Sequence, residues 1–193
     1  ETEEAFCDRL IANIEQRILA EGAHTIAAFF VEPVMAAGGI IVLLRHLERC
    51  DKEDYPCLDG TQGVTSRSVA IGNGLAQDFA QLGLGNADIY NSPLKRTAQT
   101  ESIVFDDIGG DEDWLYQCRE TMLSDALAHK APGKNLILVT HSSCIAAFEQ
   151  ALGYDSDTPA YGTSLFFTPG AEPGSLDVLG FLDANDWAAA RRS

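Results

Sequence analysis

The stretch IIVLLRHLER, from Ile40 to Arg49, decides the fold class of this chain. Its leading apolar run is typical of a strand buried on both faces of a sheet, and a charged loop that contains His46 follows at once. A second junction of this kind lies in NLILVTHS, residues 135–142, where His141 follows the apolar run. Because α/β proteins bind ligands in the loops directly after such strands, both histidines are expected at one edge of a sheet.

Outward from this stretch, strand-like apolar runs alternate with helix-like amphipathic segments. Strands are predicted at 40–45, 88–90, 136–140, 163–167 and 176–181, and helices at 65–82, 94–104, 113–130 and 143–152. In the helix that begins at Thr65, the expected apolar face comprises Ile71, Leu75, Phe79 and Leu82. The alternation predicts an α/β fold: a three-layer α/β/α sandwich around a mostly parallel sheet, with 40–45 as a central strand.

The first 39 residues form a separate predicted segment. One apolar stripe recurs every four residues: Phe6, Leu10, Ile14 and Ile18. This spacing predicts a helix that begins near Thr2 and stops near Gly22, followed by a buried strand at 25–31 and a loop at 32–39. The chain is therefore expected to consist of a helix-strand extension, 1–39, and a main domain, 40–193.

Residues 26–44 are long and apolar enough to raise the question of a membrane span. Glu32-Pro33 and Gly38-Gly39 interrupt the run, so two buried strands joined by a turn explain it better. The acidic residues that precede it do not fit a signal peptide. We therefore expect neither a membrane span nor a signal peptide in this chain.

The charge balance narrows the range of partners. The formal net charge is −16 and the pI about 4.4, which argues against nucleic acid and anionic membranes. A phosphorylated substrate would also be repelled by the bulk of this surface. Any phosphate site must therefore be a local basic pocket on an acidic protein.

The five cysteines are too few and too scattered for a fold built on disulfides. The sequence contains no C-x-x-C pair, so we expect no structural zinc site, no other metal and no cofactor. Cys50 and Cys57 flank a short acidic loop and are either one small disulfide or two free thiols; the sequence leaves both readings open.

The residues around the two histidines suit the handling of a phosphoryl group. An imidazole attacks phosphorus and leaves again, which splits hydrolysis into two easier steps. Arginine binds two oxygens with its planar fork and stays charged. Arg45 and Arg49 flank His46, and Arg96 lies in SPLKRTAQT (92–100), near the start of a predicted helix whose backbone amides favour anions.

RHLER after an apolar strand, SPLKRTAQT in the middle and VTHSS later resemble the histidine phosphatase superfamily, which has the phosphoglycerate-mutase-like fold. The resemblance covers about residues 40–182. Further positions, RCD at 49–51 and HSSC at 141–144 among them, look like the lipopolysaccharide core heptose(II)-phosphate phosphatase branch, whose members are exported bacterial enzymes. The resemblance implies His46 as the phosphorylated nucleophile. It implies Arg45, Arg49, Arg96 and His141 as the phosphate pocket, with Ser142 beside it.

The chain departs from the superfamily pattern in three places. Leu47 and Ser142 stand where Gly usually follows each catalytic His, and Leu47 is expected to narrow the pocket, although the heptose-phosphatase branch also lacks that Gly. The third departure is the general acid that protonates the leaving oxygen. Asp111 in the acidic loop 106–113 is the first choice and Glu112 the second, with Glu48 or water as the alternative.

Residues 1–39 resemble an internal segment of class III (omega) aminotransferases, including the turn at Glu32-Pro33-Val34. They lack the lysine and the aspartate that would hold pyridoxal phosphate, so the resemblance implies no transamination here. A chimera joined at 39–41 is the simplest interpretation. The segment is expected to dock on the main sheet, or to mediate a homodimer if its strand edge stays unpaired.

These observations predict a metal-independent phosphomonoester hydrolase that acts through a covalent phosphohistidine on a phosphorylated small molecule, such as a sugar. The alternatives are a phosphate-binding domain without turnover and a recombined or designed chimera whose activity was never selected. The sequence names neither the substrate nor the compartment.

Overall fold

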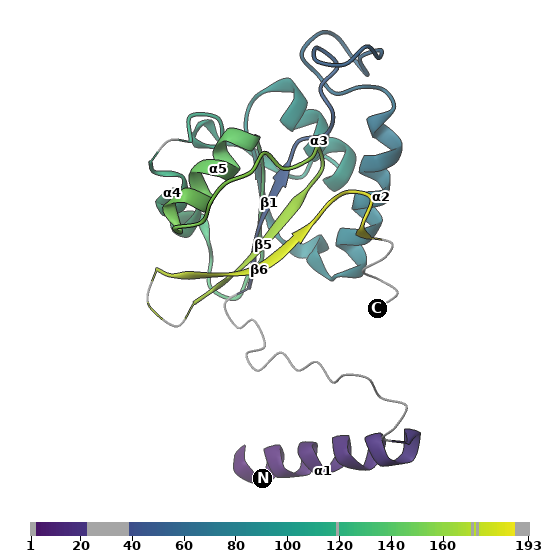
Figure 1. The fold of residues 1–193 in the computed structure, drawn as a ribbon, viewed down its shortest axis with the longest axis vertical. Helices are drawn as coiled ribbons and strands as arrows, with labels where there is room; N and C mark the ends of the chain where they lie inside the picture. Colours follow the sequence, from purple (N-terminus) through teal and green to yellow (C-terminus); the bar gives the residue numbers. More distant parts are fainter. Residues whose placement is uncertain (1–2, 23–38, 119, 171, 173, 188–193) are drawn as a thin grey trace. The chain divides into compact units, whose positions relative to one another are not determined.

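The computed structural model describes residues 3–22, 39–118, 120–170, 172 and 174–187. The chain divides into two compact units, Glu1–Met35 and Ala36–Ser193. The first unit contains α1, Glu3–Glu21, on which Ile11 and Leu19 are exposed. The second unit contains the sheet (Figure 1). In chain order its elements are β1 (Ile41–Arg45), α2 (Ser68–Gln81), η2 (Leu84–Asn86), β2 (Asp88–Asn91), α3 (Lys95–Phe105), β3 (Gly110–Asp111), η3 (Asp113–Leu115), α4 (Met122–His129), β4 (Leu136–Thr140), α5 (Ser142–Ala151), β5 (Ser164–Pro169) and β6 (Leu176–Leu182).

The six strands form one sheet in the order β3-β2-β4-β1-β5-β6. β1, β4, β2 and β3 are parallel, with Ile41 opposite Leu136 in the central pair. β5 runs antiparallel to β1, and β6 antiparallel to β5. The mixed sheet, the central position of β1 and the terminal strand pair confirm the predicted α/β fold.

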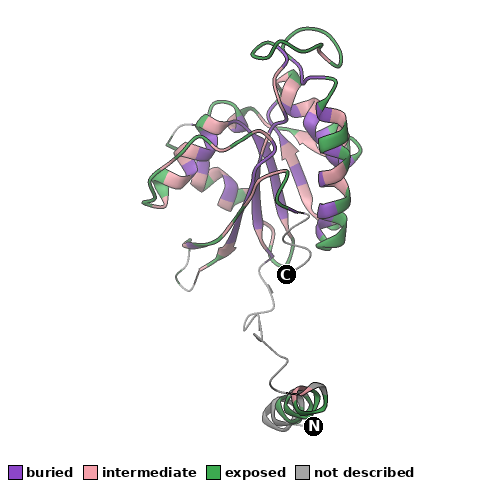
Figure 2. Ribbon diagram, turned by 45° about the vertical axis from the view of Figure 1, so that its right-hand side comes forward, coloured by how far each residue is buried: buried purple, intermediate pink, exposed green. Residues whose placement is uncertain are grey.

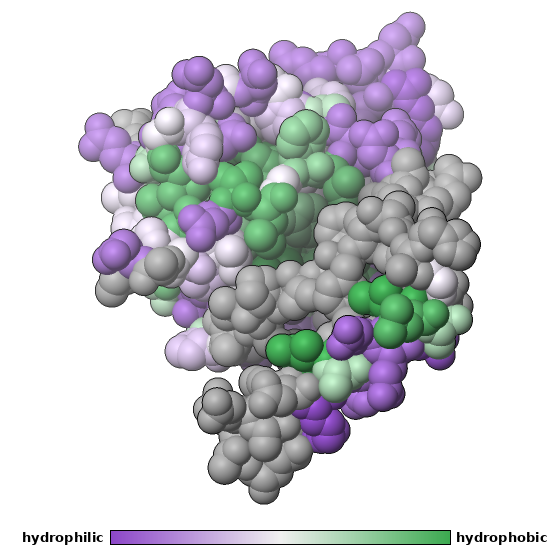
Figure 3. Space-filling view, turned by 60° about the horizontal axis from the view of Figure 1, so that its bottom comes forward, coloured by the Kyte–Doolittle hydropathy of each residue, from purple (hydrophilic) through white to green (hydrophobic). Residues whose placement is uncertain are grey.

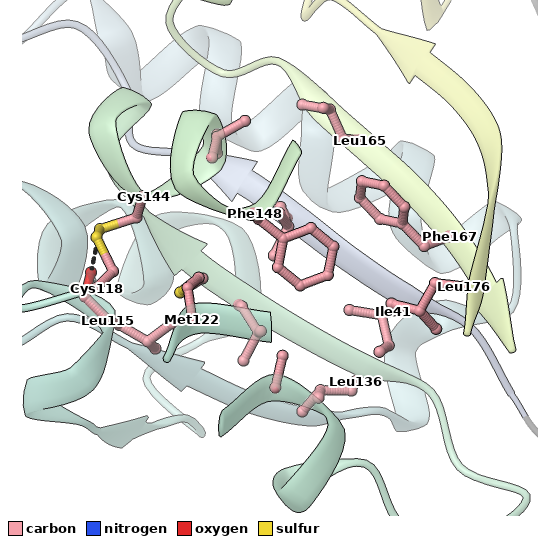
Figure 4. Packing of buried hydrophobic residues seen from close by; sticks show 14 residues of the cluster. Ile41, Leu115, Cys118, Met122, Leu136, Cys144, Phe148, Leu165, Phe167 and Leu176 are labelled. Carbon is pink, nitrogen blue, oxygen red and sulfur yellow. Dashed lines mark hydrogen bonds between the residues drawn. A yellow bond between two sulfur atoms is a disulfide. The ribbon is translucent and has the colours of Figure 1, made fainter. Parts of the chain in front are cut away.

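Alternate residues of β1 enter two separate cores. Ile41 and Leu43 belong to the cluster that Met122 of α4 and Phe148 of α5 complete (Figure 4). The next residue along, Val42, points to the other face and joins the cluster with Phe79 of α2. Helices thus cover both faces of a buried sheet (Figure 2), which is why β1 is a continuous apolar run and not an alternating one.

Two predicted helices differ from the structure. The segment 113–130 is not one helix: η3 and α4 are separated by a loop in which Cys118 is bonded to Cys144. α2 begins at Ser68, because the Thr65 hydroxyl bonds Glu48 and Ser68 and does not cap the helix.

The apolar face predicted for α2 is also partly wrong. Leu75 and Phe79 are buried as expected, but Ile71 and Leu82 are exposed. The helix buries Gly72 on this face, where an added Cβ would lie 2.5 Å from the side chain of Ile103 of α3. Gly72 therefore marks a close contact between α2 and α3. A face predicted from large apolar residues alone does not include it. The short strand β3 was not predicted, and the predicted strand 25–31 and loop up to residue 38 lie outside the described residues.

Hydrophobic side chains gather on the face shown in Figure 3, bordered by hydrophilic ones. On the edge strand β6, Val178, Leu179 and Phe181 are exposed. In the part of the chain that the structure describes, no helix has the length and apolar character needed to cross a membrane. The homodimer stays a prediction, because the strand edge on which it was based lies outside the described residues.

Candidate active site

The carboxyl ends of four parallel strands line one edge of the sheet. Asp111 ends β3, Ser92 follows β2, His141 follows β4 and His46 follows β1, in that spatial order. The His46 N–H donates to Thr140 O at 3.0 Å and so extends the ladder between β1 and β4. With strands about 4.8 Å apart, the two histidines are neighbours, whereas β3 lies about 14 Å from β1.

The two ring nitrogens of His46 have different roles. Nδ1 lies 2.7 Å from Leu47 O, and because a carbonyl oxygen only accepts, Nδ1 carries the proton. The lone pair is therefore on Nε2. Burial above all, and then His141 and the nearby arginine cations, lower the pKa of His46 to about 3. The ring is thus neutral at physiological pH, as a nucleophile requires.

His141 lies beside His46, with ring centroids 5.3 Å apart. Its Nε2 is 2.7 Å from the Ser92 hydroxyl, which also accepts from the Leu94 N–H at 3.3 Å. The hydroxyl proton is then available to His141 Nε2, which leaves the ring proton on Nδ1. Burial, followed by three arginine charges, lowers the pKa of His141 to about 3. The sequence did not assign Ser92 this orienting role.

Three arginines surround the histidines from three segments. Arg45 ends β1, stacks on the Tyr161 ring at 4.1 Å and donates to Pro159 O. Arg49 follows in the next loop and is bound by both oxygens of Asp51. Arg96 lies in the first turn of α3; burial and the charge of Arg49 lower its pKa. All three charges act on His141, so the structure brings the predicted pocket residues together.

Buried donors without a partner mark the centre of this site. Among the described residues, five buried nitrogens have no hydrogen-bond partner: Arg45 Nε, Arg96 Nε and His141 Nδ1 from the site residues, and the indole nitrogens of Trp114 and Trp187. A buried donor left unpaired costs about 1–3 kcal/mol, so an anion that accepts from the three site nitrogens would offset that cost. α5 begins directly after His141, at Ser142, and its amino-terminal dipole favours the same anion.

Two tyrosines that the sequence analysis did not select lie against the histidine rings. The Tyr161 ring centroid is 5.6 Å from that of His46, and the Tyr116 centroid is 5.7 Å from that of His141. Tyr161 stands just before β5, whose antiparallel direction brings its amino end to the edge where β1 ends. The direction of β5 is the only feature of the sequence that could have placed Tyr161 near His46. Tyr116 could not be placed in this way, because it lies in the segment that was wrongly predicted as one helix.

Leu47 does not narrow the pocket, contrary to expectation. Its side chain is 1% exposed and points into the core. A Cβ added to Gly72 would lie 3.0 Å from the Leu47 side chain, and a Cβ added to Gly162 would lie 3.4 Å from it. These two glycines therefore make room for the Leu47 side chain. The Leu47 N–H donates to the Thr100 hydroxyl at 2.9 Å. The residue after His46 therefore packs in the core and does not point toward the histidine pair.

The candidate acids occupy different surroundings. Asp111 accepts from Asn91 Nδ2 at 2.7 Å, and Asn91 also donates to Ser92 O, so Asp111 joins the site through these two residues. Glu112 lies 3.8 Å from His129 Nε2, away from the histidine pair. Glu48 binds Arg67 through both oxygens, and this bonding lowers the pKa of its carboxyl. Glu48 is thus a poor proton donor.

Two disulfides flank the site. Cys50–Cys57 forms, which resolves one open question, and Cys118–Cys144 forms as well, which the sequence did not suggest (Figure 4). Cys144 lies three residues after His141, and Cys118 two residues after Tyr116. In the described residues no group of three or more His, Cys, Asp or Glu side chains is placed to hold a metal ion.

The imidazoles of His46 and His141 are expected not to titrate between pH 5 and pH 8. Burial and the arginine charges disfavour the imidazolium, so the neutral forms persist down to a pKa of about 3. Labelling with ¹³C-histidine and NMR against pH checks this, with His46→Gln and His141→Gln assigning the signals. A titration near the ordinary pKa of 6.5 would mean that the rings are not buried beside the arginines as described.

Comparison with curated proteins finds phosphatases. The chain is 30% identical over 117 residues to the lipopolysaccharide core heptose(II)-phosphate phosphatase of Salmonella arizonae, which covers 55% of this chain and 54% of the relative. The chain thus spans about half the length of the curated relatives it matches. No protein-family model matches it.

Comparison with solved structures finds the same fold. A SixA protein from Agrobacterium tumefaciens matches with a TM-score of 0.59 at 16% identity, covering 76% of this chain and 99% of that one. The protein histidine phosphatase SixA complexed with tungstate matches with a TM-score of 0.63 at 14% identity, covering 76% and 98%. The second unit therefore has the histidine phosphatase fold, as the sequence resemblance predicted.

Proposed function

We propose that this chain hydrolyses phosphomonoesters through a covalent intermediate on His46, without a metal. One observation carries the proposal: a neutral imidazole with its lone pair on Nε2 lies among three buried donors that have no other partner in the described structure. A phosphoryl group supplies the acceptors that these donors lack and the electrophile that the lone pair attacks.

The proposed reaction has two steps. In the first, His46 Nε2 attacks phosphorus, the bond to the ester oxygen breaks, and a general acid protonates that oxygen. Arg45, Arg96 and the neutral His141 through its Nδ1–H hold the three other oxygens as charge develops, and Arg49 adds a third cation. In the second step water attacks the phosphohistidine and gives one proton to the conjugate base of the general acid. The bond between Nε2 and phosphorus breaks, phosphate leaves, and both the neutral imidazole and the acid are restored.

Turnover of a generic aryl phosphate in the presence of a metal chelator tests this function. An aryl group leaves without much help from an acid, so the assay depends on the nucleophile and the oxygen-binding groups alone. Release of phenol and phosphate supports the hydrolase. Binding of inorganic phosphate without turnover would instead indicate a phosphate-binding domain.

Asp111→Asn is expected to slow hydrolysis of an alkyl phosphate by about 10²-fold and that of an aryl phosphate by less than about tenfold. The proposed reason is that Asp111 protonates the leaving oxygen, which matters most for a poor leaving group. Steady-state kcat on both substrates measures the difference. Glu112→Gln, the rival acid beside it, is the control and is expected to change neither rate much; the reverse pattern would move the role to Glu112.

The substrate is proposed to be a phosphorylated small molecule, with phosphorylated sugars as the first class to test. The names of the curated relatives favour this class, and the tyrosine rings beside His46 and His141 offer aromatic surface to such a substrate. Residues 1–39 are proposed to be an aminotransferase-like segment of separate origin, and the division of the chain at Met35 into two units supports treating them apart.

A further inference from the structure

The Cys50–Cys57 disulfide closes a loop directly beside the phosphate pocket. Arg49 precedes the loop and Asp51 lies inside it. Arg49 Nε lies 2.8 Å from Asp51 Oδ1, and Arg49 Nη2 lies 2.5 Å from Asp51 Oδ2. The guanidinium of Arg49 is therefore oriented by a carboxylate that lies within the closed loop.

The ion pair is too exposed to fix Arg49 by itself. The Arg49 and Asp51 side chains keep 26% and 31% of their exposure, so water competes for both groups. Ion pairs exposed to water contribute little free energy, because the entropy lost in ordering two side chains offsets the attraction between their charges. Whatever holds Asp51 in place therefore determines how often Arg49 faces the pocket.

The loop has little apolar packing to hold it. Its residues 51–56 are all exposed, whereas Cys50 is buried. The loop ends are tied by the bridges Arg49↔Val64 and Cys57↔Thr65, and Arg67 lies over the Tyr55 ring at 4.7 Å. The Ser66 N–H also donates to Pro56 O, and Arg67 lies 3.9 Å from Glu53. These contacts act at the base and on one side of the loop, and the disulfide adds a covalent restraint between the loop ends.

We propose that the Cys50–Cys57 disulfide is a positioning element of the phosphate pocket: it holds Asp51 where that carboxylate turns Arg49 toward the phosphoryl group. The inference rests on the proposed function. Without the disulfide, Arg49 faces the pocket in a smaller fraction of molecules, and apparent affinity falls by that fraction. Bound substrate draws Arg49 back, so the rate at saturation is largely kept.

The test compares Cys50→Ser/Cys57→Ser in the wild-type chain and in an Arg49→Ala chain. KM and kcat for an aryl phosphate, and Kd for inorganic phosphate by calorimetry, are measured for all four proteins. In the wild-type background, KM and Kd are expected to rise roughly five- to tenfold, with kcat within about twofold. In the Arg49→Ala background the same change is expected to alter KM by less than about twofold, because there is no guanidinium left to position.

Unchanged KM and Kd in the wild-type background would overturn the proposal. An equal rise in both backgrounds would overturn it too, since the disulfide would then act on the fold and not through Arg49. If the double serine variant does not fold, Asp51→Asn keeps the disulfide, breaks the same link, and is expected to give the same background-dependent rise. If the wild-type chain has no turnover, the proposed function fails, but Kd for phosphate still decides the positioning role.

Discussion

His46→Ala is expected to lower kcat for an aryl phosphate by at least about 10⁴-fold and to leave the Kd for inorganic phosphate within about threefold. The imidazole supplies the attacking electron pair, and no neighbouring group replaces it: His141 Nε2 is engaged by the Ser92 hydroxyl. The oxygen-binding donors come from Arg45, Arg96 and His141, so the anion still binds. Steady-state kinetics and calorimetry on the same preparations measure the two quantities.

The matched control is His129→Ala, which removes an imidazole outside the pocket. His129 contacts Trp114 and Tyr90 and lies near Glu112, so its loss is expected to change kcat by less than about threefold. Residual turnover above about one hundredth in His46→Ala would mean that water attacks the ester directly. Loss of phosphate binding in the same variant would mean that His46 holds the anion and does not attack it.

Arg96→Ala is expected to lower kcat/KM by about 10²–10³-fold. Arg45 and Arg96 each have a buried Nε without a hydrogen-bond partner among the described residues. However, Arg45 is also held by Pro159 O and the Tyr161 ring, and Arg49 is held by Asp51. Arg96 is therefore the cation most available to the transferring phosphoryl group. Burial and the charge of Arg49 lower the pKa of Arg96, because both disfavour its charged form. A bound dianion offsets both effects.

Two variants make this prediction specific. Lys95→Ala removes the neighbouring charge, which pairs with Asp59 at 2.9 Å outside the pocket, and is expected to change kcat/KM by less than about threefold. Arg96→Lys keeps the charge but loses the planar fork, and is expected to recover about a tenth of wild-type activity. Equal losses in Lys95→Ala and Arg96→Ala would show that overall charge, and not a placed guanidinium, supports turnover.

The features that could be predicted from the sequence are those that depend on residues close together in the chain. The apolar runs before His46 and before His141 both form strands. A strand that is buried on both faces is apolar throughout and does not alternate apolar with polar residues, which is why these continuous runs predict strands. Parallel pairing of these strands then places the two histidines side by side. Arg96, predicted from its place near the start of a helix, reaches the same edge because its segment follows β2.

The errors arose where distant residues decide the outcome. Leu47 looked like an obstruction because its neighbours in sequence do not reveal that Gly72 and Gly162 make room for it in the core. The segment 113–130 has apolar residues at helical spacing, but Cys118 is bonded to Cys144, 26 residues away, and the helix is interrupted there. The orienting hydroxyl of Ser92 depends on a pairing across 49 residues.

Trapping the phosphoenzyme tests the central claim most directly. Wild-type protein and His46→Ala are mixed with an aryl phosphate, quenched under denaturing alkaline conditions that preserve phosphohistidine, and digested for mass spectrometry. Our account predicts one phosphoryl group on the peptide that contains His46 in the wild type, and none in the variant. Turnover with no phosphopeptide at any quench time, or the group on His141 instead, would contradict it.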